Sequence, residues 1–285
     1  MANTREIKRR IRAVDNIQQI TKAMEMVSAA KLRRAQDNVL AARPYSERLE
    51  LTLQRLSNAG VALDHPLLQK PKSNKLALAV IAGDRGLAGS YNANILRHAS
   101  KRLQEHDDVM LIPIGRRVLD YFRRRSYEMG AAFVNIGEEA SFSKAEEIAD
   151  YLMSLFVEGQ VGEVRLVYTQ FVSAITQRTE EMQLLPLPQP EASQQGQDAA
   201  EYIFVPSAEG LLKELLPKLV KNQVFRALLE SKASEHGARM TAMRSASDNA
   251  VELIDSLTLQ FNRARQAAIT TEISEIVGGA EALSS

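Results

Sequence analysis

Long stretches of helical apolar periodicity occupy both ends of this chain and constrain its fold more than any other feature. Over residues 3–57, apolar side chains recur every three or four positions, the spacing of one face of an α-helix. At 1.5 Å per residue, this segment predicts a helix of roughly 80 Å. Pro44 lies inside it and predicts a kink or a break. Residues 58–75 contain Gly, Asn and two prolines, and this composition predicts a loop.

The second helical pattern covers residues 208–280 and has the heptad spacing of a coiled coil. From Leu229 to Ala268, apolar and small residues are separated by four and three positions in turn. Pro217 lies near the start, so the continuous helix could begin either at about 208 or at this proline. A long helix gains stability mainly by packing its apolar face against a partner. The two long helices are therefore predicted to pair, antiparallel, as a two-stranded coiled coil.

Between these helices, short apolar runs alternate with helical patterns. The runs typical of buried strands are 76–82, 109–115, 131–137 and 163–172. The helical patterns lie at about 91–106, 116–126 and 143–157. This alternation predicts a mostly parallel sheet covered on both faces, with a further, antiparallel strand over 173–187. Residues 186–201 are rich in Pro and Gln and predict a loop or linker.

The predicted fold class is thus α plus α/β, a long antiparallel two-helix coiled coil with an inserted Rossmann-like domain. The expected divisions are an N-terminal coiled-coil helix at 1–57, the α/β domain at 76–200 and a C-terminal coiled-coil helix at 208–285.

Composition excludes several classes of function. The formal net charge is +1, which does not favour a nucleic-acid-binding protein. The chain has no cysteine, so it has no disulfide, thiolate metal site or catalytic thiol, which fits a reducing compartment. No apolar run approaches the roughly 18 residues that span a bilayer, and the N-terminus lacks the apolar core of a secretory signal. The histidines lack metal-ligand spacing, so no metal is expected.

The sequence VIAGDRGLAGSYN, residues 80–92, lies where a strand turns into a helix, the usual place for a phosphate-binding loop. Its glycine spacing matches neither known phosphate motif, no lysine follows, and Asp84 would repel a phosphate. Tight turning explains the glycines better. Asp84 and Arg85 are candidates for mutual pairing or for contact with a partner. Two functions remain open: a mechanical coupling subunit, or a nucleotide-binding enzyme with a coiled-coil dimerisation arm.

Four blocks of sequence carry a resemblance that covers nearly the whole chain. They are ITKAMEMV at 20–27, GDRGLAGSYN at 83–92, ASEHGARMTAMRSASDNA at 233–250 and NRARQAAITTEISEIVGGAEAL at 262–283. In content and order they are similar to the gamma subunit of the F-type ATP synthase, bacterial type.

The resemblance implies a rotor shaft with no cofactor and no active site of its own. Its coiled coil would stand inside the hexamer of alpha and beta subunits. Its α/β domain would form a foot against the epsilon subunit and the membrane ring of c subunits. Ion flow would turn the ring and the shaft, and the shaft would change the conformation of each beta subunit in turn. Contact with the membrane would occur only through the c-ring, at the cytoplasmic face of the cell membrane.

The resemblance also implies contact residues. Arg265 and Gln266 match family positions that bind the beta subunit, and Thr270 and Met24 lie in stretches near that contact. The alternatives are a solvated helix face for the first three and ordinary seam packing for Met24.

Two further groups of residues complete the expected contacts. Arg9 and Arg10 belong to a basic N-terminal segment that would suit an acidic loop of beta, although a solvated helix face is the usual interpretation of such a segment. Tyr202 and Val205 resemble the part of the foot that touches the c-ring, and the alternative there is a short strand packed on the domain. The expected foot also includes Asp84 and Arg85.

Overall fold

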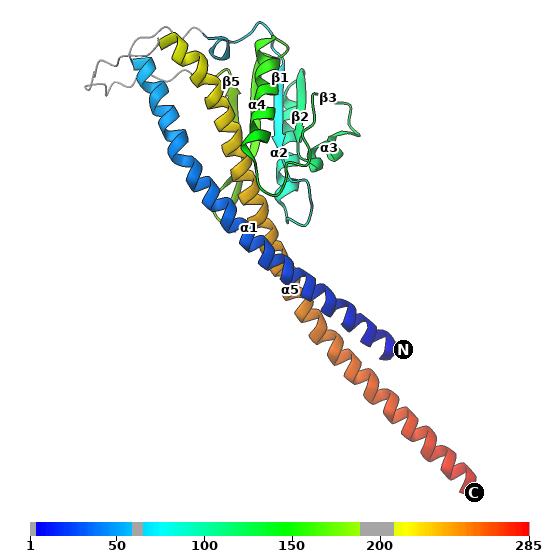
Figure 1. The fold of residues 1–285 in the computed structure, drawn as a ribbon. Helices are drawn as coiled ribbons and strands as arrows, with labels where there is room; N and C mark the ends of the chain where they lie inside the picture. The colour runs from blue at the N-terminus through cyan, green and yellow to red at the C-terminus, as the bar shows by residue number, and fades with distance from the viewer. Residues whose placement is uncertain (1–3, 59–64, 189–207, 285) are drawn as a thin grey trace. The chain divides into compact units, whose positions relative to one another are not determined.

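The computed structural model describes residues 4–58, 65–188 and 208–284 (Figure 1). The chain divides into two compact units, one formed by Met1–Val27 with Met240–Ser285 and the other by Ser28–Arg239. Two long helices, α1 at Thr4–Asn58 and α5 at Ala208–Ser284, contribute to both units. In the sequence, the strands of the central sheet thus lie between the N-terminal and C-terminal helices, as predicted.

Pro44 and Pro217 both lie inside the long helices. Helix α1 continues through Pro44, so a break there was the wrong expectation, and α5 continues through Pro217 rather than starting there. A proline removes one backbone N–H and crowds the preceding turn. The packing of the flanking residues outweighs this cost, since Leu49 and Leu53 of α1 and Leu216 and Leu219 of α5 are buried.

In the first unit, the first part of α1 forms an antiparallel pair with the part of α5 that contains Arg244 and Ser247. The Gln18 side-chain amide donates to Ser247 Oγ over 3.5 Å, and Arg244 Nε donates to Glu25 Oε1 over 2.9 Å. From the first of these bonds to the second, the residue number rises in α1 and falls in α5, which is the order expected of antiparallel helices. The seam of α5 buries small and apolar residues at the predicted heptad positions, namely Met243, Ser247, Ala250 and Leu257.

The second unit contains a five-stranded sheet with the order β3-β2-β1-β4-β5. Strands β1 to β4 run parallel, and β5 pairs antiparallel with β4, as predicted. Their bounds are Leu76–Ile81 for β1, Val109–Ile114 for β2, Glu128–Met129 for β3, Glu163–Phe171 for β4 and Gln177–Leu185 for β5. Strand β1 is buried along its whole length, because the sheet is covered on both faces.

Helices cover both faces of this sheet (Figure 1). Helices α2, at Tyr91–Glu105, and α3, at Arg116–Phe122, pack with Leu78 and Val80 of β1 in one apolar cluster. On the other face, α4, at Phe142–Val157, and the Ala208–Arg239 part of α5 pack with Ala77 and Ala79. A short 3-10 helix, η1, at Pro66–Leu68 precedes β1. We call residues 65–188, with this sheet and α2 to α4, the α/β domain.

The strand predicted over 131–137 is wrong. The edge strand β3 lies earlier, at Glu128–Met129, and Phe133 forms only an isolated bridge with Ile114. Asn135 and Gly137 have positive φ angles of 57° and 88°, which end an extended run. The backbone N–H groups of Asn135 and Ile136 donate to the Asp84 carboxylate instead of to a strand. A tertiary contact therefore replaces strand pairing here.

Glu181 of β5 gives a first testable prediction, because two arginines converge on its carboxylate. Arg102 Nη2 and Arg165 Nη1 donate to Oε1 over 2.6 and 2.8 Å, and His98 Nε2 lies 3.2 Å from Oε2. Burial raises the pKa of Glu181, but these hydrogen bonds outweigh burial and lower it to about 2. Since the folded pKa lies below the unfolded value, this stabilisation is complete above about pH 4.5 and is lost as the pH falls toward 2.

Glu181→Gln is therefore expected to lower the free energy of unfolding by about 2 kcal/mol at pH 7. The difference from the unmodified chain should shrink as the pH falls from 4.5 to 2. Urea unfolding at a series of pH values measures both effects. Glu180→Gln, at the neighbouring residue of β5, is the control. A Glu181→Gln deficit that stays constant across this pH range would contradict the assignment.

Candidate functional site

The end of α5 exposes apolar side chains. From Arg265 to Ala280 every residue of the helix is exposed. Ile269, Ile273, Ile276 and Val277 recur at helical spacing on one face, with exposed fractions from 47% to 68%. Such a stripe on a helix end is typical of a surface that another chain covers.

The candidate polar residues lie in the same segment. Arg265, Gln266 and Thr270 are all exposed. Thr270 Oγ1 donates to the Gln266 carbonyl over 2.9 Å, so the hydroxyl is used within the helix. Arg265 has no ion-pair partner in the part of the chain that the structure describes, and its guanidinium is available to a carboxylate of another chain.

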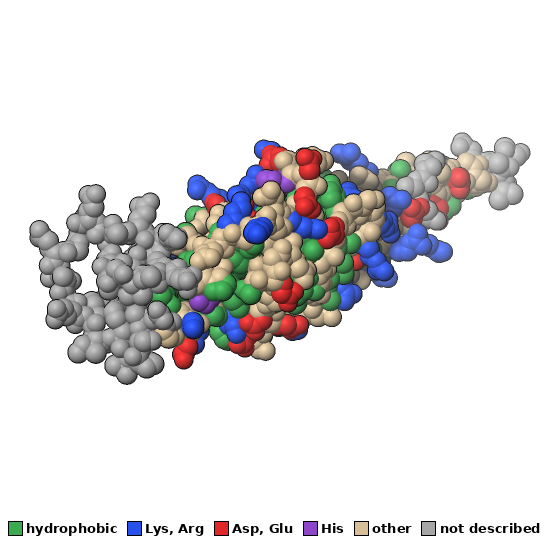
Figure 2. Space-filling view, turned by 90° about the horizontal axis from the view of Figure 1, so that it is seen from above, with side chains coloured by type: hydrophobic (Ala, Val, Ile, Leu, Met, Phe, Trp, Pro, Cys, Tyr) green, Lys and Arg blue, Asp and Glu red, His purple; other side chains and the backbone are tan. Residues whose placement is uncertain are grey.

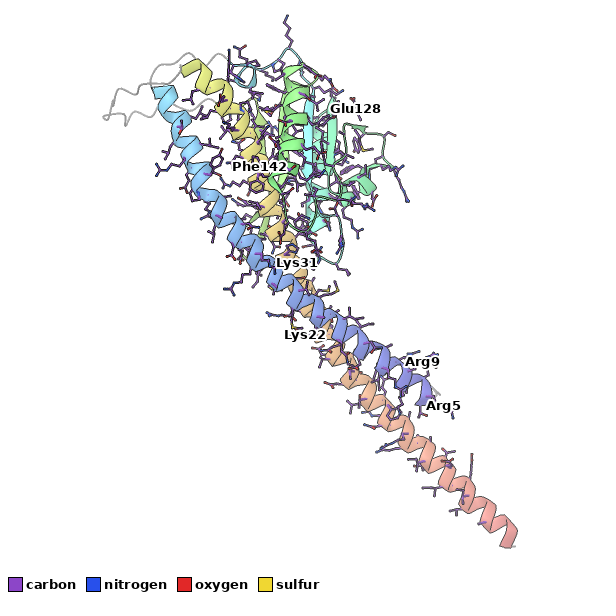
Figure 3. The ribbon with its side chains drawn as sticks, in the orientation of Figure 1. Arg5, Arg9, Lys22, Lys31, Glu128 and Phe142 are labelled. Atoms are coloured by element: carbon purple, nitrogen blue, oxygen red, sulfur yellow. The ribbon has the colours of Figure 1, made fainter. Side chains whose placement is uncertain are left out.

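The first part of α1 carries the basic candidates (Figure 3). Arg9 and Arg10 are both exposed, and Arg10 pairs with Glu6 over 2.6 Å, one turn away. Met24 is half-buried, which fits seam packing with one side left accessible. Ile17, Ile20 and Val27 are more than half exposed. This part of α1 therefore combines exposed positive charge with apolar surface.

The glycine-rich turn after β1 is held by the chain's own polar groups. Gly83 N–H donates to Asn92 Oδ1 over 3.0 Å, and the Asn92 amide donates to the Arg85 carbonyl over 3.2 Å. A Cβ on Gly83 would lie 3.1 Å from the Glu235 carboxyl carbon. A bound phosphate would thus meet two carboxylates, those of Asp84 and Glu235, at close range. This geometry disfavours the nucleotide-binding alternative.

Asp84 and Arg85 do not pair with each other. The Asp84 carboxylate accepts three backbone N–H groups, from Arg116 over 2.9 Å, Asn135 over 3.1 Å and Ile136 over 3.0 Å. Arg85 is exposed and forms an ion pair with Glu138 over 3.4 Å. Asp84 therefore joins three loops of the α/β domain, and Arg85 remains accessible. Tyr202 and Val205 lie outside the described residues.

Asp84→Ala is expected to destabilise the chain by about 2 kcal/mol, because three N–H groups lose their acceptor at a half-buried position. Thermal unfolding measures this loss. Asp84→Asn keeps one acceptor oxygen, so its melting temperature should lie between those of the alanine variant and the unmodified chain. If the alanine variant melts at the same temperature as the unmodified chain, the bonding role of Asp84 is refuted.

Sequence reasoning missed the part of α5 that contacts the α/β domain. The heptad spacing placed Ala233 and His236 in a coiled-coil seam, yet Glu235 beside them is buried between Lys232 Nζ, at 3.2 Å, and Arg239 Nη2, at 2.7 Å. His236 is also buried, with Nε2 3.4 Å from the Glu138 carbonyl. The available signal was the run ESKASEH, in which polar residues occupy every face of the helix.

Charge on the visible surface is mixed. Figure 2 shows Lys and Arg side chains interspersed with Asp and Glu side chains over the face in view, with no broad field of one sign. This agrees with the formal net charge of +1. Among the described residues, no helix combines the length and the apolar character needed to cross a bilayer.

Comparison with known proteins identifies relatives that match this chain over almost its full length. A family model described as ATP synthase matches residues 3–283. The ATP synthase gamma chains of Heliobacterium modesticaldum and Desulfitobacterium hafniense are 53% and 52% identical to this chain, covering 99% of it and 100% of each relative.

Solved structures agree with this match. The structure titled central stalk/c-ring of the Tetrahymena thermophila mitochondrial ATP synthase has a TM-score of 0.62 at 27% identity, over 80% of this chain and 99% of the other. A chain of the Euglena gracilis mitochondrial ATP synthase shares the fold, with a TM-score of 0.69 at 20% identity, over 98% of this chain and 94% of the other. Sequence, family model and fold agree, and the chain belongs to the ATP synthase gamma chain family.

Proposed function

We propose that this chain is the central rotor shaft of an ATP synthase and that it couples rotation of the c-ring to conformational changes in the catalytic beta subunits. The observation that carries the proposal is the fully exposed apolar end of α5, which requires a partner to cover it. The hexamer of alpha and beta subunits would provide that cover. Membership of the gamma chain family and the likeness to a structure of a central stalk with its c-ring support the same role.

The chain itself would be non-catalytic, with ATP chemistry performed by the beta subunits. Differential contact of the shaft with open and closed beta subunits would shift their populations as it turns. The proposed location is peripheral, at the cytoplasmic face of the cell membrane, with the c-ring as the link to the bilayer. The nucleotide-binding alternative is disfavoured by the carboxylates of Asp84 and Glu235 at the glycine-rich turn.

The contact residues follow from this role. Arg265, Gln266 and Thr270 on α5, with Met24, Arg9 and Arg10 on α1, are proposed to face beta subunits. The foot against epsilon and the c-ring would contain Tyr202 and Val205, with Arg85 a more available contact than Asp84, whose carboxylate already accepts three N–H groups. The proposed divisions are the helices at 1–57 and 208–285 and the domain at 76–200.

Co-expression with alpha and beta subunits of a close relative tests the proposal. The expected product is a complex with one copy of this chain per three alpha and three beta subunits, and with rotary ATPase activity. The isolated chain should bind no ATP or NAD at micromolar concentrations in calorimetry. Failure to assemble, or micromolar nucleotide affinity of the isolated chain, would overturn the proposal.

A further inference from the structure

One stretch of α5 is buried although it is polar. Every residue from Glu230 to Gly237 is buried, and Glu230, Ser231, Lys232, Ser234, Glu235 and His236 all carry polar side chains. We call Glu230–Gly237 the polar segment. Burial of a polar group costs free energy unless a hydrogen bond replaces its contact with water. The identity of the groups that bond to this segment therefore indicates what it does.

Two serines of the polar segment complete the sheet where β1 stops. The last pair between β1 and β4 joins Val80 to Val167, so Thr169 of β4 lies beyond the end of β1. Thr169 N–H donates to Ser231 Oγ, and Ser234 Oγ donates to the Thr169 carbonyl, each over 3.3 Å. Both bonds are buried. At this position a helix supplies the donor and the acceptor that a neighbouring strand would otherwise supply.

The same stretch contacts the other loops at the carboxyl edge of the sheet. Arg239 Nη2, just past the polar segment, donates to the Gly86 carbonyl over 3.2 Å and to Glu235 Oε1 over 2.7 Å. His236 Nε2 lies 3.4 Å from the Glu138 carbonyl, which can only accept, so this nitrogen carries the proton. Two loops, after β1 and after β3, and strand β4 at Thr169 are thus bonded to one helical stretch.

These bonds differ in kind from the apolar packing of α5 against the sheet, in which Leu216, Leu219 and Val220 are buried. Apolar contacts are non-directional, so they set no specific angle between a helix and the surface it packs on. Hydrogen bonds require specific distances and angles, so several bonds around one helix resist its rotation about its own axis. We propose that the polar segment and Arg239 fix α5 to the α/β domain, so that the helix and the domain rotate as one body and torque passes between them here.

This inference rests on the proposed rotor function and deepens it, because a shaft transmits torque only where its parts do not turn against each other. A reversible cross-link tests it directly. A Cβ on Gly237 would lie 3.5 Å from Ala174 Cα and 3.4 Å from the Ala174 carbonyl oxygen, ordinary contact distances. The chain contains no cysteine, so within it the pair Ala174→Cys and Gly237→Cys can form only one disulfide.

In the assembled complex, the oxidised double-cysteine variant is expected to rotate and hydrolyse ATP within about twofold of the reduced sample. The two single-cysteine variants are the controls and should not respond to oxidant. If oxidation slows rotation more than about tenfold and reduction restores it, the helix and the domain move against each other during the cycle. The proposal would then be wrong.

Removal of the bonds is the complementary experiment. A bead is attached through Arg124→Cys in the exposed turn after α3, and its angular fluctuations are recorded in the stalled complex. Ser231→Ala with Ser234→Ala should increase the variance of the bead angle by about twofold or more, because both bonds to Thr169 are lost.

Ser247→Ala is the matched control for this experiment. It removes another buried serine of α5, one that contacts Gln18 of α1 rather than the α/β domain, and should leave the variance unchanged. An unchanged variance in the assembled double-serine variant overturns the inference. If that variant fails to fold, the cross-link decides alone. The rotor proposal fails separately, if the unmodified chain neither assembles nor rotates.

Discussion

Glu235→Gln is expected to lower the free energy of unfolding by about 3–5 kcal/mol at neutral pH. The carboxylate is buried between Lys232 and Arg239, at 3.2 and 2.7 Å. Removal of its charge leaves two cations with side chains only 11% and 12% exposed and without their shared anion. A buried charge without a partner is among the largest single destabilising changes in proteins. Urea unfolding of the purified chain measures the loss.

The pH dependence gives an independent readout of the same group. Burial raises the pKa of Glu235, but the charge of Lys232 and the hydrogen bond from Arg239 outweigh burial and lower it. A lowered folded pKa means that the stabilisation is complete above the ordinary value of about 4.5 and is lost as the pH falls through the folded pKa. The unmodified chain should thus lose more stability on acidification below pH 4.5 than the Glu235→Gln variant.

Two further variants make the result interpretable. Arg244→Gln alters another arginine of α5 that is 63% exposed, and should cost less than about 1 kcal/mol. Lys232→Met with Glu235→Leu and Arg239→Met removes all three charges and should recover most of the stability, because well-packed apolar side chains can replace a buried ion cluster. If Glu235→Gln costs no more than Arg244→Gln, the three charges do not act as a buried cluster.

The fold was predictable from sequence where local pattern and final packing agree. Strands β1 and β2 are continuous apolar runs because both of their faces are covered. Helices α1 and α5 have apolar stripes that their burial explains. The predictions failed where contacts with residues distant in the sequence determine the local structure. The 131–137 segment is not a strand, because Asp84 takes its N–H groups, and Pro44 does not interrupt α1, because flanking leucines pack.

The candidate site was predictable only in part, for a related reason. Arg265 and Gln266 are exposed because they lie beyond the part of α5 that has a partner helix. They were selected as candidate contact residues from the family resemblance and not from their spacing in the sequence. Ala233 and His236 of the polar segment keep the heptad spacing of a seam, whereas Ser231, Ser234 and Glu235 lie outside that spacing. Their bonds to Thr169 and contact with Gly83 depend on where β1 ends, which no local pattern encodes.

Removal of residues 271–285 is expected to leave the chain folded and to weaken its affinity for the alpha–beta hexamer about 100-fold or more. Within 271–280 the side-chain hydrogen bonds in the structure, from Thr271 to the Ala267 carbonyl and from Ser274 to the Thr270 carbonyl, stay inside α5. Ile273, Ile276 and Val277 are 56%, 68% and 57% exposed, so their loss removes little folded-state packing. If the hexamer covers them, each contributes about 1.5 kcal/mol or more to binding.

Two measurements separate these effects. Thermal unfolding of the truncated chain should match that of the full chain within about 2 °C, since no buried group of the α/β domain is removed. Titration of the hexamer with labelled chain should show the loss of affinity. Val157→Ser, at the end of α4, is the matched control, because Val157 is 56% exposed like Ile273 but lies on the α/β domain.

The pair of outcomes distinguishes a binding surface from a structural element. A truncated chain that melts early would mean that the end of α5 supports the fold, which the exposure of residues 265–280 does not allow. A truncated chain that melts normally and binds as tightly as the full chain would mean that the apolar stripe is not covered by the hexamer. A shaft whose tip is held by surrounding subunits predicts three results together: a normal melt of the truncated chain, its weakened binding, and unchanged binding of Val157→Ser. The reason is that apolar surface stabilises only the state in which it is buried.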